Sequence, residues 1–206
     1  MKAGVVSVHF SWSTSLIVHL SRAQILFAVL ALCTASIWIL PQPTAGENYR
    51  VNFVDVDGNA FSTADGHITI LVLLGKSNID KAHAVGDRTP DFCLANSNYR
   101  MITVLAFEKK HSKPVRMILT SLMRRRVDSE ARQLQTRYDQ LKIARNARQD
   151  ISAVADFDGT ISTQLGAQAT AALFRVFVFG RNGQLLKQWD DVPKAEELAT
   201  ALRISH

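Results

Sequence analysis

Cysteine is the first residue type to consider, because a thiolate can attack a disulfide or a peroxide. The chain has two cysteines, Cys33 and Cys93, and no Cys-x-x-Cys pair. Cys93 stands between Phe92 and Leu94. A buried apolar thiol is an inert packing residue, whereas a reactive thiol needs nearby positive charge. Cys93 is therefore the single thiol candidate for catalysis, with a packing role as the alternative interpretation.

Histidine and acidic residues give no complete metal or catalytic set. Asp80 and His83 are three residues apart, which places them on one side of a helix, but two ligands without a third make a weak metal site. Asp156 and Asp158 stand in an Asp-Phe-Asp-Gly sequence, which is typical of a turn. The sequence also contains no glycine-rich phosphate loop. We therefore expect no cofactor and no metal, and we identify no small-molecule substrate.

The remaining chemical signal is positive charge, and it is local. The net charge of the chain is +6, but residues 113–148 carry ten basic residues against three acidic ones. Three interpretations are open: a solvated charged face, docking of an acidic or membrane-embedded protein, or binding of anionic lipid. Nucleic acid is not expected, because no aromatic residues alternate with the arginines. The candidate partner-binding or lipid-binding residues are Arg124, Arg125, Arg126, Arg132 and Arg137.

A long helix is predicted to carry these arginines. Pro114 suits the first turn of a helix, and residues 115–145 contain neither glycine nor proline. Apolar residues recur there in steps of three and four, which predicts an amphipathic helix with a narrowing apolar stripe. The stripe consists of residues 115, 118, 119, 122, 123, 127, 131, 134, 138 and 141.

Apolar runs separated by turn residues predict a sheet behind this helix. Residues 176–179 form an unbroken apolar run that suits a buried strand, and Asn182-Gly183 after it favours a hairpin turn. Pro193 introduces a closing helix over residues 194–203. The predicted strands are 51–56, 68–74, 101–107, 174–179 and 184–189, and residues 60–62 are expected to pair back on the first of them.

The order of these elements resembles the thioredoxin fold, in particular its TlpA-like and AhpC/TSA (redoxin) branches. The resemblance is carried by the Asp-x-Asp-Gly of residues 156–159, the Leu-Gly of 165–166, and the strand, Asn-Gly turn, strand and helix that end the chain. It implies an α/β domain over residues 49–206, with a central mixed sheet flanked by helices.

The chain departs from this family where the family's chemistry lies. In TlpA-like proteins the strand matching residues 68–74 leads into Cys-x-x-Cys, but here Gly75-Lys-Ser-Asn follows. A second alignment matches residues 85–94 to the opening of peroxiredoxins and places Arg116 where their nucleophile stands. We prefer the first, which accounts for residues 51–74. The family's proline before the third buried strand corresponds to Leu173 or Phe174. The resemblance therefore implies a member without the redox site.

The N-terminal part predicts a membrane anchor. Residues 23–40 are eighteen residues without a charge, with Lys2 and Arg22 before them and Trp38 near their far end. This pattern predicts a single-pass signal anchor with a semi-apolar, cytoplasmic segment at 1–22, a linker at 41–48 and a periplasmic or otherwise extracytoplasmic domain. Cleavage of the segment is the alternative, although Pro43-Thr-Ala45 matches a cleavage site poorly.

These observations lead to one functional expectation and two alternatives. We expect a membrane-anchored, redox-degenerate thioredoxin-like domain that acts in protein–protein interaction or complex assembly with another membrane or periplasmic protein, and not an enzyme. The first alternative is a thiol oxidoreductase or one-cysteine peroxidase that uses Cys93. The second is an anionic-lipid surface module that uses the basic helix of residues 115–148.

Overall fold

The computed structural model describes residues 42–203. Two hydrophobic clusters, one on each face of the central sheet, consist of residues between Tyr49 and Leu202. A fragment that starts at residue 42 therefore contains the complete core of the domain. Within residues 42–203, no helix combines the length and the apolar character needed to cross a bilayer. The predicted anchor, residues 23–40, lies outside the described residues.

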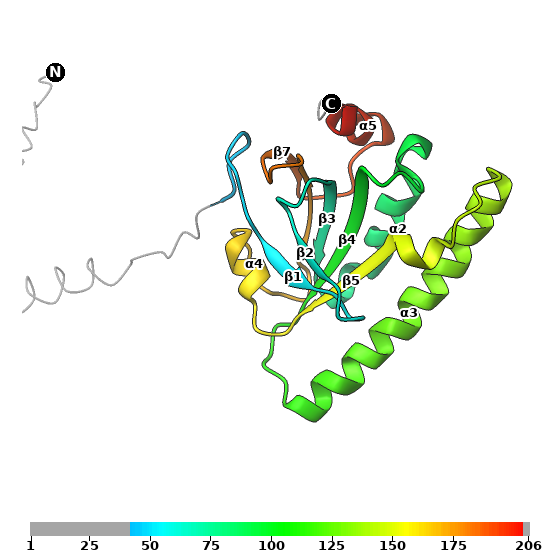
Figure 1. Ribbon diagram of the computed structural model, residues 1–206. Helices are drawn as coiled ribbons and strands as arrows, with labels where there is room; N and C mark the ends of the chain where they lie inside the picture. The colour runs from blue at the N-terminus through cyan, green and yellow to red at the C-terminus, as the bar shows by residue number, and fades with distance from the viewer. Residues whose placement is uncertain (1–41, 204–206) are drawn as a thin grey trace, which may run out of the picture. The chain divides into compact units, whose positions relative to one another are not determined.

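Five strands form the central sheet in the order β5-β4-β3-β6-β7 (Figure 1). β4 runs parallel to β3 and β5, whereas β6 runs antiparallel to β3 and β7, so the sheet is mixed, as predicted. All seven residues of β3 are buried, as its apolar sequence predicts. The strands are β3 (Ile68–Leu74), β4 (Tyr99–Ala106), β5 (Ile151–Asp156), β6 (Phe174–Phe179) and β7 (Leu185–Trp189).

The first predicted strand does not belong to this sheet. β1 (Asn52–Val54) pairs with β2 (Ala60–Ser62) in a separate two-stranded sheet, so the assignment of residues 51–56 to the central sheet is wrong. The reason is Asp55, whose carboxylate accepts hydrogen bonds from the backbone N–H groups of Asp57 and Asn59 and turns the chain after Val54.

β5 forms one edge of the central sheet, and it is not among the predicted strands. Its residues 152, 153 and 155 are serine and alanine, which have little preference for strands. β5 is held by parallel pairing along its whole length with β4.

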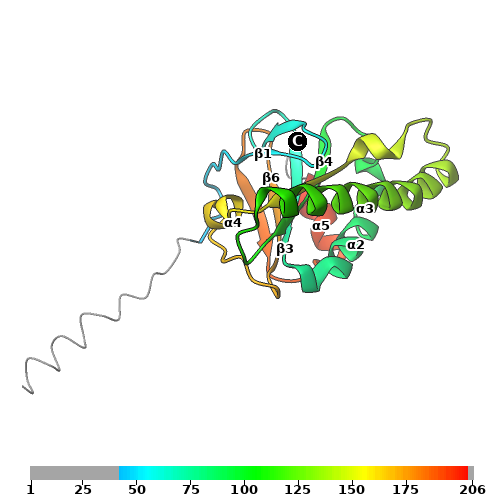
Figure 2. The same ribbon diagram turned by 90° about the horizontal axis from the view of Figure 1, so that it is seen from below.

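Helices cover both faces of the sheet (Figure 2). α2 (Ile79–Asp87) and α5 (Ala195–Arg203) pack on one face, where Val85 and Leu198 are fully buried. α4 (Thr160–Gln164) and β1 cover the other. Residues 85–87, the Val-Gly-Asp of the second alignment, therefore end a helix that follows β3 instead of opening a domain. This arrangement agrees with the TlpA-like alignment.

The long helix α3 (Lys113–Gln140) has 28 residues and ends five residues before its predicted end at 145. It ends because Lys142 adopts a left-handed backbone with a φ of 57°, a conformation that glycine usually supplies. The predicted single stripe is also wrong. Val127, Ala131 and Tyr138 are buried, whereas Ile118 and Leu122 are exposed to solvent.

Both outer edges of the sheet are partly paired within the chain. In the predicted linker at 41–48, the N–H of Gly46 donates to the carbonyl of Leu185, whose own N–H donates to the carbonyl of Glu47. At the other edge, the N–H of Val56 donates to the carbonyl of Ala153 on β5. Such pairing occupies part of each strand edge that could otherwise pair with another chain.

Candidate functional site

The start of α2 is the place where the family resemblance puts a redox dithiol. β3 ends at Leu74, and residues 75–78 lead into the helix without a cysteine. The segment 170–173 closes over this start. The N–H groups of Gly75 and Ser77 donate to the carbonyls of Leu173 and Ala171, and the Asn78 side chain donates to the carbonyls of Ala172 and Leu173. The chain itself occupies the hydrogen-bonding groups at this point.

Gly75 shows how tightly the two segments meet. A Cβ atom added to this residue would lie 2.0 Å from the carbonyl oxygen of Thr170 and 2.5 Å from that of Ala171. Glu108 fixes the same segment from the side, because its carboxylate accepts a hydrogen bond from the N–H of Ala171. At Gly75 itself, therefore, no room remains for a side chain.

Cys93, the thiol candidate, lies elsewhere, in a 3-10 turn between α2 and β4. Its residue is 8% exposed and belongs to the hydrophobic cluster under α2 and α5. Burial raises the pKa of the thiol to about 12. At neutral pH the thiolate is then about 10⁵ times rarer than the thiol, which removes the nucleophile that redox chemistry needs.

An apolar cavity of about 910 Å³ adjoins Cys93. It opens between α2, α3 and the sheet, and Met101, Thr103 and Leu105 of β4 are only half-buried beside it. β4 is an inner strand, so such exposure means that α3 does not pack closely over it. Cavities of this size commonly bind small molecules or side chains of a partner. No pattern in the sequence indicates this cavity, because it results from the distance between α3 and β4.

His83 lies on the wall of this cavity, but not as a metal ligand. Its Nδ1 atom is 2.8 Å from a carboxylate oxygen of Glu130, and its Nε2 atom is 3.0 Å from a guanidinium nitrogen of Arg126. Both ring nitrogens are thus used within the chain, by residues of α3. Among residues 42–203 no group of three metal-ligating side chains comes together.

The five arginine candidates on α3 divide into two groups. Arg124, Arg126 and Arg137 bind carboxylates of the chain itself, those of Asp57, Glu130 and Asp91 respectively. The side chains of Arg125 and Arg132 form no ion pair or hydrogen bond with any residue in 42–203. The structure therefore brings three of the candidates into the domain's own contacts and leaves the other two side chains without a contact of this kind among residues 42–203.

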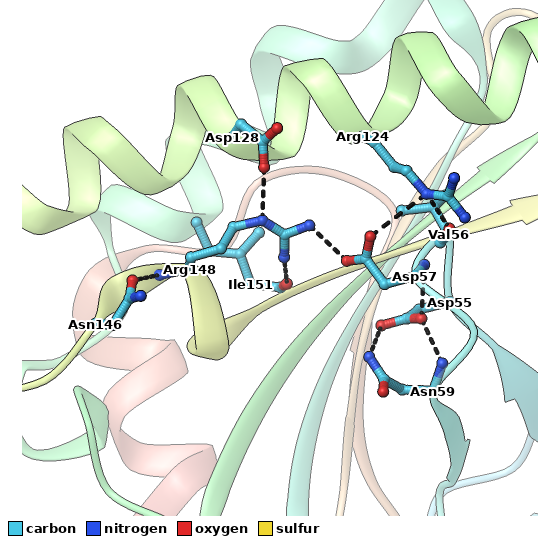
Figure 3. A network of polar contacts seen from close by, with 9 residues as sticks. All are labelled: Asp55, Val56, Asp57, Asn59, Arg124, Asp128, Asn146, Arg148 and Ile151. Atoms are coloured by element: carbon cyan, nitrogen blue, oxygen red, sulfur yellow. Dashed lines mark hydrogen bonds and ion pairs between the residues drawn. The ribbon is translucent and has the colours of Figure 1, made fainter.

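A network around Arg148 holds α3 against the sheet (Figure 3). Its guanidinium donates to Asp128 of α3 at 2.7 Å and to Asp57 in the turn after β1. Arg124 of α3 reaches the same turn and donates to the carbonyl of Val56. The guanidinium groups of Arg124 and Arg148 are therefore engaged in contacts that position the helix.

Asp156 and Asp158, both interpreted as turn residues, have different surroundings. Asp156 is 4% exposed at the end of β5, and its carboxylate accepts hydrogen bonds from the N–H and the hydroxyl of Ser162 at 2.8 and 2.6 Å. Calling Asp156 a turn residue is therefore wrong, because it is a buried acceptor that holds α4. Asp158 is exposed and pairs with Arg116, which lowers the pKa of the carboxyl group.

Comparison with known proteins gives matches by structure alone, since no protein-family model and no curated protein matches the chain. Two proteins of Aquifex aeolicus, described as an electron transfer and an electron transport protein, align with TM-scores of 0.51. They are 13% and 14% identical, and each alignment covers 81% of this chain and 99% of theirs. The exposed lipoprotein thioredoxin of Streptococcus pneumoniae aligns at 14% identity and a TM-score of 0.46, over 75% of this chain and 98% of that one.

Likeness at these identities concerns the arrangement of the backbone. The backbone arrangement is shared with the two Aquifex aeolicus proteins over 81% of this chain. The chain has the thioredoxin-like fold.

Proposed function

We propose that this chain is a redox-inactive thioredoxin-like domain that works by binding another protein at a membrane. The observation that carries the proposal is the start of α2, where the chain has no cysteine and where residues 170–173 take up the backbone and side-chain donors of Gly75, Ser77 and Asn78. A fold that keeps its framework after losing its thiols retains surfaces for binding.

The alternative function is that of a thiol enzyme using Cys93, because this residue borders the cavity. The test compares disulfide-reductase and peroxidase activity of residues 42–206 with the same fragment carrying Cys93→Ser. We expect both proteins to stay at background, because the raised pKa keeps the thiol protonated. Activity above background that disappears in the variant would show that the chain is a one-cysteine enzyme and would overturn the proposal.

The cavity between α2 and α3 supports binding of a partner's apolar side chains. Leu105 lines it and is half-buried, so a tryptophan there would occupy part of the space. The tagged full chain is purified from its native membranes as wild type, as Leu105→Trp and as Cys93→Ser. We expect a protein to copurify with wild type and with Cys93→Ser but not with Leu105→Trp. A protein that copurifies with all three, or no copurifying protein with any of them, would speak against a partner held in this cavity.

The membrane location rests on residues 23–40, which carry no charge and follow Lys2 and Arg22. We infer an uncleaved single-pass anchor with a cytoplasmic N-terminus. The full chain is expected to stay with membranes through alkaline carbonate extraction, and its domain to be digested by protease added outside the cytoplasmic membrane. A chain released by carbonate, or shortened by its first 40 residues, would contradict the anchor.

A further inference from the structure

The outer face of α3 carries large apolar side chains that nothing in the domain covers. Val115, Ile118 and Leu122 are 39%, 61% and 54% exposed. Ile118 lies nine residues before the buried Val127, and at 100° per residue the two point to opposite sides of the helix. The first three turns of α3 are therefore apolar on the side that faces away from the sheet as well as on the side that packs.

Positive charge continues the same face. Arg125 and Arg132 follow Ile118 at intervals of seven residues, so all three side chains lie along one line of the helix. Neither arginine has a partner within residues 42–203. Residues 113–127 contain five basic residues and no acidic one, but Arg116, Arg124 and Arg126 pair with carboxylates of the domain, so Arg125 and Arg132 carry the charge of this face. An occupant of this face must be apolar and negatively charged at once.

This combination excludes a second copy of the chain as a good fit, because two such faces would bring unpaired arginines together. A bilayer that contains anionic lipid has both properties, because its negatively charged phosphate groups lie directly above apolar acyl chains. Helices with basic residues beside Leu, Ile and Met bind in the plane of such an interface. Arg124, Arg126 and Arg148 are engaged within the domain and hold α3 in place with this face outward.

We propose that the outer face of α3, which consists of Val115, Ile118, Leu122, Arg125 and Arg132, binds the surface of an anionic lipid bilayer. The arginines contact lipid phosphates, and the apolar residues enter the interface. This inference is independent of the redox assignment and of the N-terminal anchor.

The experiment uses residues 42–206, whose core is complete without the anchor, and flotation with vesicles of phosphatidylcholine alone or with 30% phosphatidylglycerol. We expect flotation with the anionic vesicles only, weakening as NaCl rises from 50 to 500 mM. Because each basic residue near a charged surface contributes about fivefold in binding, Arg125→Gln with Arg132→Gln should weaken binding about 25-fold. Lys187→Gln with Lys194→Gln, an equal loss of charge at exposed residues elsewhere, should leave binding close to wild type.

A second pair of variants tests insertion of the apolar residues. Leu122→Asp should weaken binding about tenfold or more, whereas Val54→Asp, at a similarly exposed residue on β1, should change it little. Wild type that fails to float at 50 mM NaCl would overturn the proposal. So would variants that all bind alike, or a dimer in solution that Leu122→Asp converts to a monomer, which would identify a second copy as the occupant.

Discussion

Gly75→Ala is expected to lower the free energy of unfolding by about 3 kcal/mol, near the top of the range for added core atoms. The new Cβ atom would lie 2.0 Å from the Thr170 carbonyl oxygen, and backbone atoms cannot move aside as a flexible side chain can. Relief requires the segment 170–173 to separate from α2, which also breaks the hydrogen bonds to Leu173 and Ala171. Urea denaturation of residues 42–206 measures the effect.

Gly86→Ala is the matched control, because Gly86 lies inside α2 and a Cβ atom there meets nothing within 4 Å. Alanine favours the helix over glycine, so this variant should gain about 0.5–1 kcal/mol. If Gly75→Ala behaved like Gly86→Ala, the start of α2 would be open in solution. The case for a closed and inactive site would then be lost.

Asp156→Ala is expected to destabilise the domain by about 2–4 kcal/mol, because it leaves buried donors without an acceptor. The donors are the N–H and hydroxyl of Ser162 and the N–H of Ile161, all at the start of α4. Ser162 is fully buried, so water cannot replace the lost carboxylate. Thermal unfolding followed by circular dichroism gives the effect.

Asp158→Ala provides the comparison two residues away. Asp158 is solvent-exposed, and its ion pair with Arg116 lies at the surface, where such pairs contribute little. This variant should unfold within experimental error of wild type. Equal losses for the two variants would mean that the carboxylate of Asp156 has no special role in holding α4.

The N-terminal half of the domain shows what pattern reading could and could not predict. The run at residues 68–74 predicts a buried strand, and β3 is buried along its length. The alternation at residues 51–56 also predicts a strand, but Asp55 turns the chain and gives β1 a partner outside the central sheet. A local pattern indicates that a strand forms, whereas its neighbours depend on contacts between distant parts of the chain.

The basic helix shows the same limit in three dimensions. The sequence predicts a long helix rich in arginine and the position of its start. It does not show which of the five candidate arginines have partners within the domain, because all five are the same residue type. Arg124, Arg126 and Arg137 turned out to have carboxylate partners up to 67 residues away, whereas Arg125 and Arg132 have none among the described residues. Which cations face outward depends on how α3 packs.

The sequence by itself determined the α/β class, the resemblance to the thioredoxin fold, the helices that follow Pro114 and Pro193, and the absence of a Cys-x-x-Cys pair, because these depend on residue type and local periodicity. The tertiary structure alone decided that residues 170–173 close the start of α2, that Cys93 is buried, and that Ile118 faces away from the sheet. Each of these depends on packing between segments far apart in the chain, and packing distance is not encoded in any single stretch of residues.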